Sequence, residues 1–329
     1  RAGHEVTIFE KERELGGHMA TRSVGNGSAV QLDYGITHFT VKSPGFRAFV
    51  DELEEQGLAA KWSRNIGYFD GDQLHELNPN VELKTYWAPT RGFDKIVQYL
   101  SRWVEVKTAE KAGGLTYIGP DRRKKRSWMI NLTDISVFEC DAVIIAAPAP
   151  QALGVLQTAQ DETPARKIIR HIDEIRYHSA YALMALYRNR EIPPFDGVYC
   201  DDDRLSWVIN ETSKKDSPQG DVGLVIQSGT SFADQHRKTA PERIEELLLE
   251  RTGEIIGGWC SSPDWTDIHY WKHTQAVNPM DELFLEMDME GAALALVGDY
   301  LGGNTLESAY LSGYNLADYW IEKYKEVVA

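Results

Sequence analysis

Val6-Thr7-Ile8-Phe9-Glu10-Lys11, followed closely by Gly16-Gly17-His18-Met19-Ala20-Thr21, is the segment from which the fold class can be inferred. The β-branched and aromatic residues at positions 6 to 9 predict a short strand, and Glu10 places a carboxylate at its end. Such a carboxylate can accept two hydrogen bonds from a ribose, as it does in dinucleotide-binding folds. The glycine pair predicts a tight turn or a close approach of the backbone to a ligand. Many strands end in Glu simply because they meet solvent, so it is the combination that favours a dinucleotide-binding α/β domain.

A second motif of this kind lies near the end of the chain. Residues 294–299 read Leu-Ala-Leu-Val-Gly-Asp, which predicts a strand ending at Gly298 and Asp299, and a helix is predicted from about Glu307 to Tyr324. A helix N-terminus favours an electron-rich group, such as the pyrimidine end of a reduced flavin. Taken alone, Asp299 is equally consistent with a helix cap or a turn.

Apolar residues at helical spacing predict further helices over residues 46–57, 93–100 and 241–252. Residues 140–148 form a continuous apolar run that ends in small residues and proline. Runs of this kind are typical of a central strand covered on both faces. The middle of the chain, about 151–279, alternates predicted strands and helices.

The net charge of the chain indicates which classes of partner it can bind. The chain has 329 residues, with 35 Lys and Arg against 50 Asp and Glu, so its net charge is −15. A chain this acidic is a poor general nucleic-acid binder, because phosphate contacts require positive surface. Residues 122–126 form a basic run that we interpret as a solvated turn between two strands, with a nucleic-acid or membrane patch as the alternative.

Cysteine usage and hydropathy bear on the compartment. Cys140, Cys200 and Cys260 are far apart and odd in number, which argues against a disulfide framework or a zinc site, so no metal is expected. Few cysteines without such a pattern fit a reducing, cytoplasmic compartment. No apolar run reaches the roughly 18 residues needed to cross a membrane, and no signal peptide is recognisable, so a soluble protein is expected.

Taken together, these motifs resemble the renalase-like branch of the FAD-dependent amine oxidase superfamily. The matching stretches are residues 3–11, 16–22, 32–40, 140–148, 297–299 and 306–313. The Met-Ala-Thr triplet after the glycine pair and the spacing from Gly-Asp to Ser-Gly at the end are the most specific features. The resemblance spans nearly the whole chain and is weakest between residues 151 and 279.

The resemblance implies an α/β chain, α+β overall, with two domains. A discontinuous, Rossmann-like FAD-binding domain would comprise residues 1–45, 100–150 and 290–329. A substrate domain with a mixed or antiparallel sheet, as in amine oxidases, would comprise residues 46–99 and 151–289.

The resemblance also implies roles for individual residues. Glu10, followed by Lys11, would hold the adenosine ribose, and Asp299 with Gly298 would contact the ribityl-pyrophosphate region. The remaining cofactor-binding residues would be Gly16, Gly17, His18, Met19 and Thr21 along the pyrophosphate and flavin, Gly35, His38 and Phe39 near the isoalloxazine, and Glu307, Ser308 and Ala309 at a helix start facing the pyrimidine ring.

Two departures from the family pattern stand out. The family usually has Arg where this chain has His18, and a neutral imidazole supplies one donor in place of a charged fork. The family's Gly-x-Gly-x-x-Gly loop would precede Glu10 by about 20 residues, and the sequence starts ten residues before Glu10. We expect this loop, with its strand, to precede Arg1 in the natural protein; a chain that lacked it would bind FAD badly.

The implied function is hydride transfer from a small substrate to FAD, with dioxygen becoming hydrogen peroxide. An isomeric dihydronicotinamide dinucleotide is the favoured substrate. A flavin amine oxidase, a desaturase or isomerase, and a catalytically degenerate flavoprotein-fold binding protein are the alternatives.

The sequence supports two residues as substrate contacts, His38 and Trp271, and assigns no catalytic residue. The other tryptophans, Trp207, Trp259, Trp265 and Trp320, are interpreted as core or interface packing rather than an aromatic cage, because aromatics carry much of a core's burial. Lone histidines such as His269 and His273 are more often structural than catalytic. The oligomeric state is not predicted.

Overall fold

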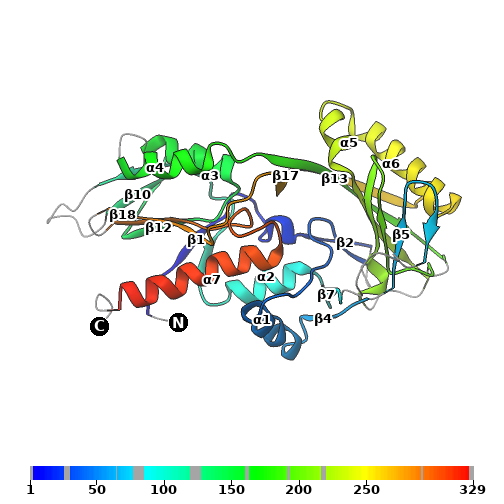
Figure 1. Ribbon diagram of the computed structural model, residues 1–329, viewed down its shortest axis with the longest axis horizontal. Helices are drawn as coiled ribbons and strands as arrows, with labels where there is room; N and C mark the ends of the chain where they lie inside the picture. The colour runs from blue at the N-terminus through cyan, green and yellow to red at the C-terminus, as the bar shows by residue number, and fades with distance from the viewer. Residues whose placement is uncertain are drawn as a thin grey trace. The chain divides into compact units, whose positions relative to one another are not determined.

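The computed structural model describes residues 3–25, 30–63, 65–76, 85–118, 127–159, 163–190, 193–215, 220–289 and 292–325 (Figure 1). The basic run at 122–126 lies outside these residues. The chain divides into two compact units, residues 1–15, 101–177 and 275–329 (unit 1) and residues 16–100 and 178–274 (unit 2). These units group residues 16–45 with unit 2, and residues 151–177 and 275–289 with unit 1, so their boundaries differ from those of the predicted domains. Which segments bind a cofactor stays a prediction.

Unit 1 contains three small sheets. Strand β1 (Thr7–Phe9) pairs in parallel with β8 (Glu105–Lys107). Strand β19 (Ala292–Leu296) pairs in parallel with β12 (Ala142–Ile145) and antiparallel with β18 (Leu285–Met289). The antiparallel strands β9 (Ala112–Tyr117), β10 (Trp128–Leu132) and β11 (Val137–Cys140) form the third sheet.

Helices complete unit 1. α3 (Ala149–Leu156) and α4 (Thr163–Ile172) share one apolar core with the fully buried Trp128 and Leu294. The last helix, α7 (Leu306–Lys323), begins at a capping box in which the Thr305 side chain and Ser308 bond each other's backbone N–H groups. The helix predicted near Glu307 is therefore confirmed.

One predicted strand differs from the structure. The run at 140–148 was expected to form one strand covered on both faces, but Cys140 ends β11 and only residues 142–145 form β12. In the described part of the chain, β12 pairs only with β19, and its burial alternates, with Ile144 49% exposed. The prediction of two covered faces is thus wrong there, because β12 is a sheet edge and a strand presents successive side chains to opposite faces.

Unit 2 is built on a seven-stranded sheet with the order β17-β13-β16-β15-β14-β5-β6. These strands are β17 (Trp265–Ala276), β13 (Tyr177–Tyr187), β16 (Val222–Ser228), β15 (Leu205–Asn210), β14 (Gly197–Cys200), β5 (Ile66–Phe69) and β6 (Leu74–His75). β14 and β5 run parallel, whereas β15 pairs antiparallel with both β14 and β16. The sheet is therefore mixed, as expected.

Helices α5 (Thr230–Gln235) and α6 (Pro241–Ile256) cover one face of this sheet (Figure 1). Leu224 and Ile226 of β16 pack there with Leu248 of α6, and all three side chains are fully buried. This core exists because the inward residues of the strands are aliphatic at every second position.

Smaller elements complete unit 2. Two antiparallel strand pairs occur, β2 (Thr21–Val24) with β3 (Val30–Asp33) and β4 (Ala59–Lys61) with β7 (Trp87–Pro89). The helices are α1 (Pro44–Glu55) and α2 (Phe93–Ser101), with a short 3₁₀ helix, η1 (Gly17–Met19), near the start and another, η3 (Glu211–Ser213), after β15. α1 begins where Ser43 Oγ accepts the N–H of Phe46 at 3.3 Å and Pro44 occupies the first turn. The predicted helices at 46–57, 93–100 and 241–252 are thus confirmed to within a few residues.

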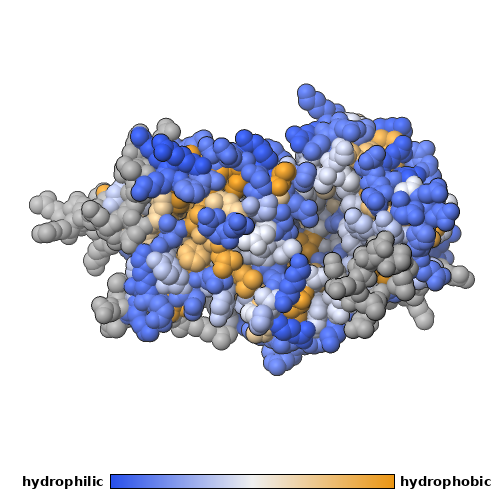
Figure 2. All heavy atoms as spheres, in the orientation of Figure 1, coloured by the Kyte–Doolittle hydropathy of each residue, from blue (hydrophilic) through white to orange (hydrophobic). Residues whose placement is uncertain are grey.

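The surface is largely hydrophilic on the face drawn in Figure 2, which agrees with a net charge of −15. Cys140, Cys200 and Cys260 are free thiols. None of the helices in the described residues combines the length and apolarity that crossing a bilayer requires.

The core of unit 2 yields a stability prediction. Replacing the fully buried Leu224 by Ala removes packing beneath α6 and should lower the free energy of unfolding by about 3 kcal/mol. Leu74→Ala, on β6 and 42% exposed, is the matched control and should cost less than about 1 kcal/mol. Urea unfolding followed by circular dichroism measures both, and equal losses would show that this face of the sheet is not the core.

Candidate functional site

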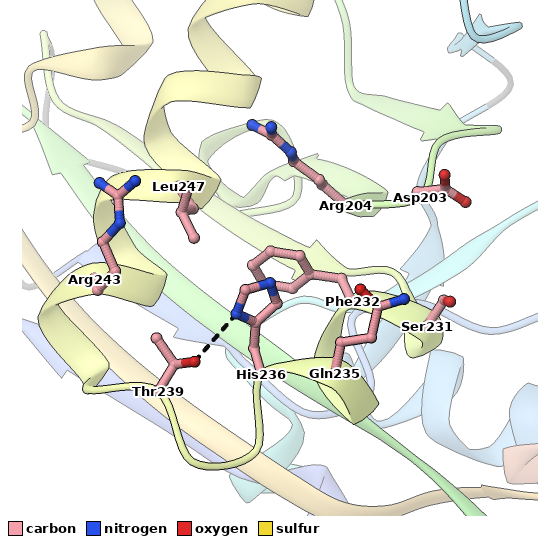
Figure 3. Close-up of a pocket in the computed structure, with 9 residues that line it drawn as sticks. All are labelled: Asp203, Arg204, Ser231, Phe232, Gln235, His236, Thr239, Arg243 and Leu247. Atoms are coloured by element: carbon pink, nitrogen blue, oxygen red, sulfur yellow. Dashed lines mark hydrogen bonds between the residues drawn. The ribbon is translucent and has the colours of Figure 1, made fainter.

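A surface pocket of about 490 Å³ lies between α5, α6 and the start of β15 (Figure 3). Arg204 and Arg243 line it, but each guanidinium already faces a glutamate of α6, at 3.7 Å from Glu250 and 2.8 Å from Glu246. None of the residues predicted to bind cofactor or substrate lines this pocket. The candidate site therefore has to be built from the predicted residues themselves.

The glycine pair forms the turn that the sequence predicts. Gly16 and Gly17 have φ values of 133° and 53°, in the region that residues with a side chain rarely adopt. The Met19 N–H donates to the Gly16 carbonyl at 2.8 Å and closes η1. The φ of 133° at Gly16 requires glycine, and the turn places His18 at its centre.

Gly35 packs directly against that turn. A Cβ atom at Gly35 would lie 2.1 Å from the carbonyl oxygen of His18, a distance that no side chain tolerates. The Ile36 N–H donates to the same carbonyl at 2.7 Å. The structure thus brings together two predicted motifs, the glycine pair and the segment around Gly35.

Trp271, which the sequence marks as a substrate contact, lies against this turn. Its indole N–H donates to the Tyr34 carbonyl at 2.9 Å, and its ring meets the His18 imidazole edge-on, with ring centroids 4.8 Å apart. The His269 ring lies 4.1 Å from Trp271, measured between centroids. Trp271 is therefore held at both its ring and its N–H.

His18 is held in its neutral form. Burial, together with the nearby His273 and His269, lowers the pKa of His18 from 6.5 to about 4. Among the described residues, no group of three or more His, Cys, Asp or Glu side chains is arranged to hold a metal ion, so this histidine cluster does not form one.

Three aromatic rings surround the His38 imidazole. Its ring lies 4.7 Å from Trp207, 4.9 Å from Tyr86 and 5.6 Å from Trp62, measured between centroids. Burial, followed by repulsion from Lys214, lowers the pKa of His38 to about 3. His38 is therefore a neutral imidazole among aromatic rings.

The rings around His38 continue as a row across three strands. The strand register places Tyr68 of β5 beside Tyr199 of β14, and Tyr199 beside Trp207 of β15. The two tyrosine rings stack with an interplanar angle of 9° and a centroid distance of 6.0 Å, and Tyr199 meets Trp207 at 5.2 Å. We call Tyr68, Tyr199, Trp207, Tyr86 and Trp62 the aromatic tract.

The aromatic tract adds residues to the candidate site that the sequence did not indicate. Trp207 was interpreted as packing, and it does pack against Tyr86 and Tyr199; it also lies beside His38, a predicted site residue, and remains partly exposed. The signal in the sequence was the alternation in β15, where Val208 faces the core and Trp207 faces the other side. The contact between Trp207 and His38 itself joins residues far apart in sequence, and no local pattern indicates it.

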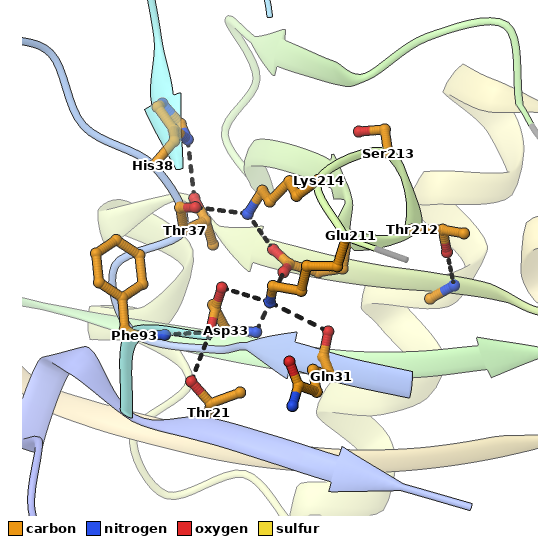
Figure 4. A network of polar contacts seen from close by, with 12 residues as sticks. Thr21, Gln31, Asp33, Thr37, His38, Phe93, Glu211, Thr212, Ser213 and Lys214 are labelled. Carbon is orange, nitrogen blue, oxygen red and sulfur yellow. Dashed lines mark hydrogen bonds and ion pairs between the residues drawn. The ribbon is translucent and has the colours of Figure 1, made fainter. Parts of the chain in front are cut away.

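A group of four buried charges, three of them labelled in Figure 4, is linked to His38 through Thr37. Asp33, Glu211, Lys214 and Lys215 have side-chain exposures between 0 and 4%. Lys215 Nζ lies 2.5 Å from Asp33 Oδ2 and 2.9 Å from Glu211 Oε2, and Lys214 pairs with the other oxygen of Glu211. We call these four residues the buried quartet.

Other predicted residues of unit 2 serve the packing around the quartet. Thr21 Oγ1 donates to Asp33 Oδ1 at 2.6 Å. The Phe39 ring is 6% exposed and packs against Phe46 and Phe93, with centroids 5.9 and 6.2 Å apart. Whether these residues also contact a cofactor stays a prediction.

The predicted residues of unit 1 lie at two places. At the end of β1, Glu10 Oε1 accepts the Glu12 N–H at 2.8 Å, and Lys11 pairs with Glu12 at the surface. Within the described residues, Glu10 Oε2 accepts no hydrogen bond. One carboxylate oxygen thus supports the turn, and the other bonds no donor among the described residues.

The second place is the loop between β19 and α7. The Gly298 N–H donates to Ser312 Oγ of α7 at 3.0 Å, which ties the strand end to the helix. Burial raises the pKa of the adjacent Asp299. Asn304 bonds both backbone groups of Ala276 at 2.8 Å and fixes the loop ahead of α7. Glu307, Ser308 and Ala309 form the first turn of that helix, where Ser308 is engaged in the cap.

Two family models match this chain. A family model described as NAD(P)-binding Rossmann-like domain matches residues 1–53, and one described as flavin containing amine oxidoreductase matches residues 56–320. Renalase from Mus musculus is 23% identical over 284 residues, which cover 84% of this chain and 78% of renalase.

Two solved structures share the fold at low identity. Cyclohexylamine oxidase from Brevibacterium oxydans IH-35A superposes with a TM-score of 0.72 at 10% identity, covering 98% of this chain and 95% of that one. An oxidoreductase from Methanosarcina mazei gives a TM-score of 0.65 at 14% identity, covering 96% and 95%. The match extends over both units of the chain.

The neutral His18 predicts a pH dependence of stability. Its folded pKa lies below its ordinary value, so between pH 6.5 and about 4 the unfolded chain binds a proton that the folded chain refuses, and stability falls as the pH falls. In His18→Gln this contribution disappears, and the loss of unfolding free energy between pH 6.5 and 4.5 should shrink by about 1 to 2 kcal/mol. Denaturant unfolding at both pH values measures it. An unchanged loss would mean that His18 is solvated in the folded protein.

Proposed function

The chain belongs to the flavin containing amine oxidoreductase family, and we propose that it oxidises a small-molecule substrate with FAD as cofactor and dioxygen as electron acceptor. The favoured substrate is an isomeric dihydronicotinamide dinucleotide. In that reaction the substrate loses a hydride and becomes aromatic, and dioxygen receives two electrons and two protons to form hydrogen peroxide.

The observation that carries the proposal is the neutral His38 beside the aromatic tract. Flat aromatic surfaces favour a planar ring through offset stacking. His38 Nδ1 lies 2.9 Å from Thr37 Oγ1, so the Nε2 atom of the neutral imidazole is left to form one hydrogen bond with a substrate group such as a carboxamide. Trp62, Tyr86 and Trp207 crowd the imidazole, and such crowding excludes the water that would compete for the substrate. Similarity to renalase over 84% of the chain supports the same substrate class.

The residues present in unit 1 fit a ribose-containing cofactor. Glu10 Oε2 accepts no hydrogen bond in the described part of the chain, and a carboxylate at the end of a strand suits ribose hydroxyls. Asp299 is partly buried, and this burial raises the pKa of its carboxyl group. We propose that Glu10 binds the adenosine ribose and that Asp299, next to Gly298, binds the ribityl-pyrophosphate region.

The turn in unit 2 also fits close approach by a ligand. The positive φ values of Gly16 and Gly17 expose backbone without a Cβ atom, and the Gly35 contact keeps that turn in place. We propose that this turn, from Gly16 to Thr21, lines the pyrophosphate and flavin. When bound, the flavin supplies the hydride-accepting centre. The protein's share is then to orient the substrate and exclude water, and no protein nucleophile is required.

A substrate panel tests the proposed function. The protein purified with FAD should show a bound-flavin absorption spectrum that isomeric dihydronicotinamides bleach under anaerobic conditions, with hydrogen peroxide released once air is admitted. Primary and secondary amines form the comparison set, since aromatic rings also attract cations. Bleaching by amines alone would show that the protein is a flavin oxidase whose substrate is an amine and not a dihydronicotinamide. A colourless protein that takes up no added FAD would favour the binding-protein alternative.

The proposed role of Asp299 predicts a cofactor phenotype. Asp299→Asn removes a charge-assisted hydrogen bond and should weaken FAD binding at least tenfold, as measured by fluorescence titration of the apoprotein. Asp318→Asn, an exposed carboxylate on α7 of the same unit, is the matched control and should bind FAD like the wild type. Equal affinities in all three proteins would remove Asp299 from the cofactor site.

A further inference from the structure

Lys214 and Lys215 are adjacent in sequence and belong to the same buried quartet, with side-chain exposures of 0% and 4%. Asp33 and Glu211 supply two negative charges, so the four formal charges balance. If charge balance were the only role of the quartet, the two lysines would have equivalent partners. Their hydrogen bonds differ, however.

Among the described residues, Lys215 bonds only to β3 and η3. Its ammonium reaches Asp33 Oδ2 at 2.5 Å, Glu211 Oε2 at 2.9 Å and the carbonyl of Gln31 at 3.3 Å. Asp33 and Gln31 belong to β3, and Glu211 belongs to η3. Lys215 therefore fastens β3 to η3.

Lys214 reaches beyond the quartet. Its ammonium pairs with Glu211 Oε1 and also donates to the Thr37 carbonyl at 2.5 Å (Figure 4). Thr37 Oγ1 in turn lies 2.9 Å from His38 Nδ1. Lys214 thus holds the residue whose side chain contacts the imidazole.

Lys214 approaches the same imidazole through a second route. Its ammonium lies 5.1 Å from the centroid of the Trp62 ring, which neighbours the His38 ring. The Trp62 indole N–H donates to Ser213 Oγ at 2.9 Å, so this ring is fixed from η3 as well. The backbone and one wall around His38 both depend on the lysine.

We propose that Lys214 is a positioning residue of the candidate site, which fixes the orientation and the hydrogen-bonding form of the His38 imidazole through Thr37 and Trp62, whereas Lys215 only fastens the fold. A catalytic effect of Lys214 rests on the proposed function. The structural link from Lys214 to His38 is independent of that function.

The charges around His38 agree with this assignment. Among the described residues, the ionisable groups that face the imidazole are Lys214 from the segment after η3 and the Tyr86 phenol from the segment before β7. Repulsion from Lys214 lowers the pKa of His38 beyond the effect of burial. Burial also lowers the pKa of Lys214 itself, which the attraction of Glu211 opposes. Removing the lysine should therefore let His38 accept a proton more readily.

The test compares Lys214→Met with Lys215→Met by ¹⁵N resonances of the His38 imidazole, assigned with His38→Gln. In the wild type and in Lys215→Met, one neutral tautomer is expected at pH 7. In Lys214→Met, the two nitrogen resonances should move toward a tautomer average, and the pKa of His38 should rise by at least one unit. Both variants lose one cation from the same quartet, so similar decreases in melting temperature are expected.

Two further variants keep the proposal testable if either methionine variant fails to fold. Lys214→Arg retains the charge and should restore the single tautomer. The double variant Glu211→Gln, Lys214→Met keeps the quartet neutral and should still show the averaged tautomer. If Lys214→Met and Lys215→Met alter the His38 resonances equally, or if neither alters them, the positioning role is wrong.

Flavin reduction by the substrate separates this proposal from the proposed function. Lys214→Met should slow reduction at least tenfold, with a smaller effect of Lys215→Met and recovery in Lys214→Arg. Averaged tautomers in Lys214→Met together with no substrate oxidation by the wild type would overturn the proposed function and support the positioning role. Normal turnover in a Lys214→Met protein with unchanged resonances would overturn the positioning role alone.

Discussion

The buried quartet joins parts of unit 2 that are far apart in sequence. The Asp33 N–H donates to Glu211 Oε2 at 3.3 Å across 178 residues, and the Phe93 N–H donates to Asp33 Oδ1 at 3.1 Å. Moving charges out of water costs several kcal/mol per ion, and only complete pairing offsets this cost. A quartet of this kind adds little net stability. It does destabilise any fold in which β3 and η3 are displaced from one another, because such a fold would leave a buried charge unpaired.

That constraint explains why the turn around His18 can be built from glycines. Gly16 and Gly17 are conformationally permissive and would not hold a shape by themselves. β3 is fixed by the quartet, and Gly35, two residues after Asp33, packs against the carbonyl of His18. Gln227 of β16 also donates to the Gly35 carbonyl at 2.9 Å. The flexible turn therefore takes its geometry from a rigid neighbour.

Local signals in the sequence predicted the elements well. Apolar residues at helical spacing indicated the helices at 46–57, 93–100 and 241–252, because side chains three and four residues apart share one face of a helix. The prediction of one central strand at 140–148 was wrong, because hydrophobicity alone does not show how many neighbouring strands a strand has. The match to a known family, by contrast, could be read from the motifs directly.

The parts of the candidate site that the sequence did not reveal depend on pairing over long distances. Lys214-Lys215 looks like a solvated pair, since lysines are almost never fully buried unless they are paired, and their carboxylate partner Asp33 lies far away in sequence. Tyr68, Tyr199 and Trp207 form a row only through the register of β5, β14 and β15, and Trp207 meets His38 only in the folded chain, across 169 residues of sequence. Strand register follows from the whole sheet, and a single sequence does not contain it in any local form.

The desolvation of the two histidines limits the chemistry that the site can perform. The lowered pKa values of His18 and His38 leave both imidazoles neutral over the physiological pH range, so neither supplies a fixed positive charge. A group whose pKa lies far below the working pH is a weak base, so these imidazoles contribute orientation more than proton transfer. Hydride transfer to a flavin needs a well-aligned substrate and the absence of water. A site made of aromatic rings, neutral imidazoles and a rigid ionic support meets those requirements.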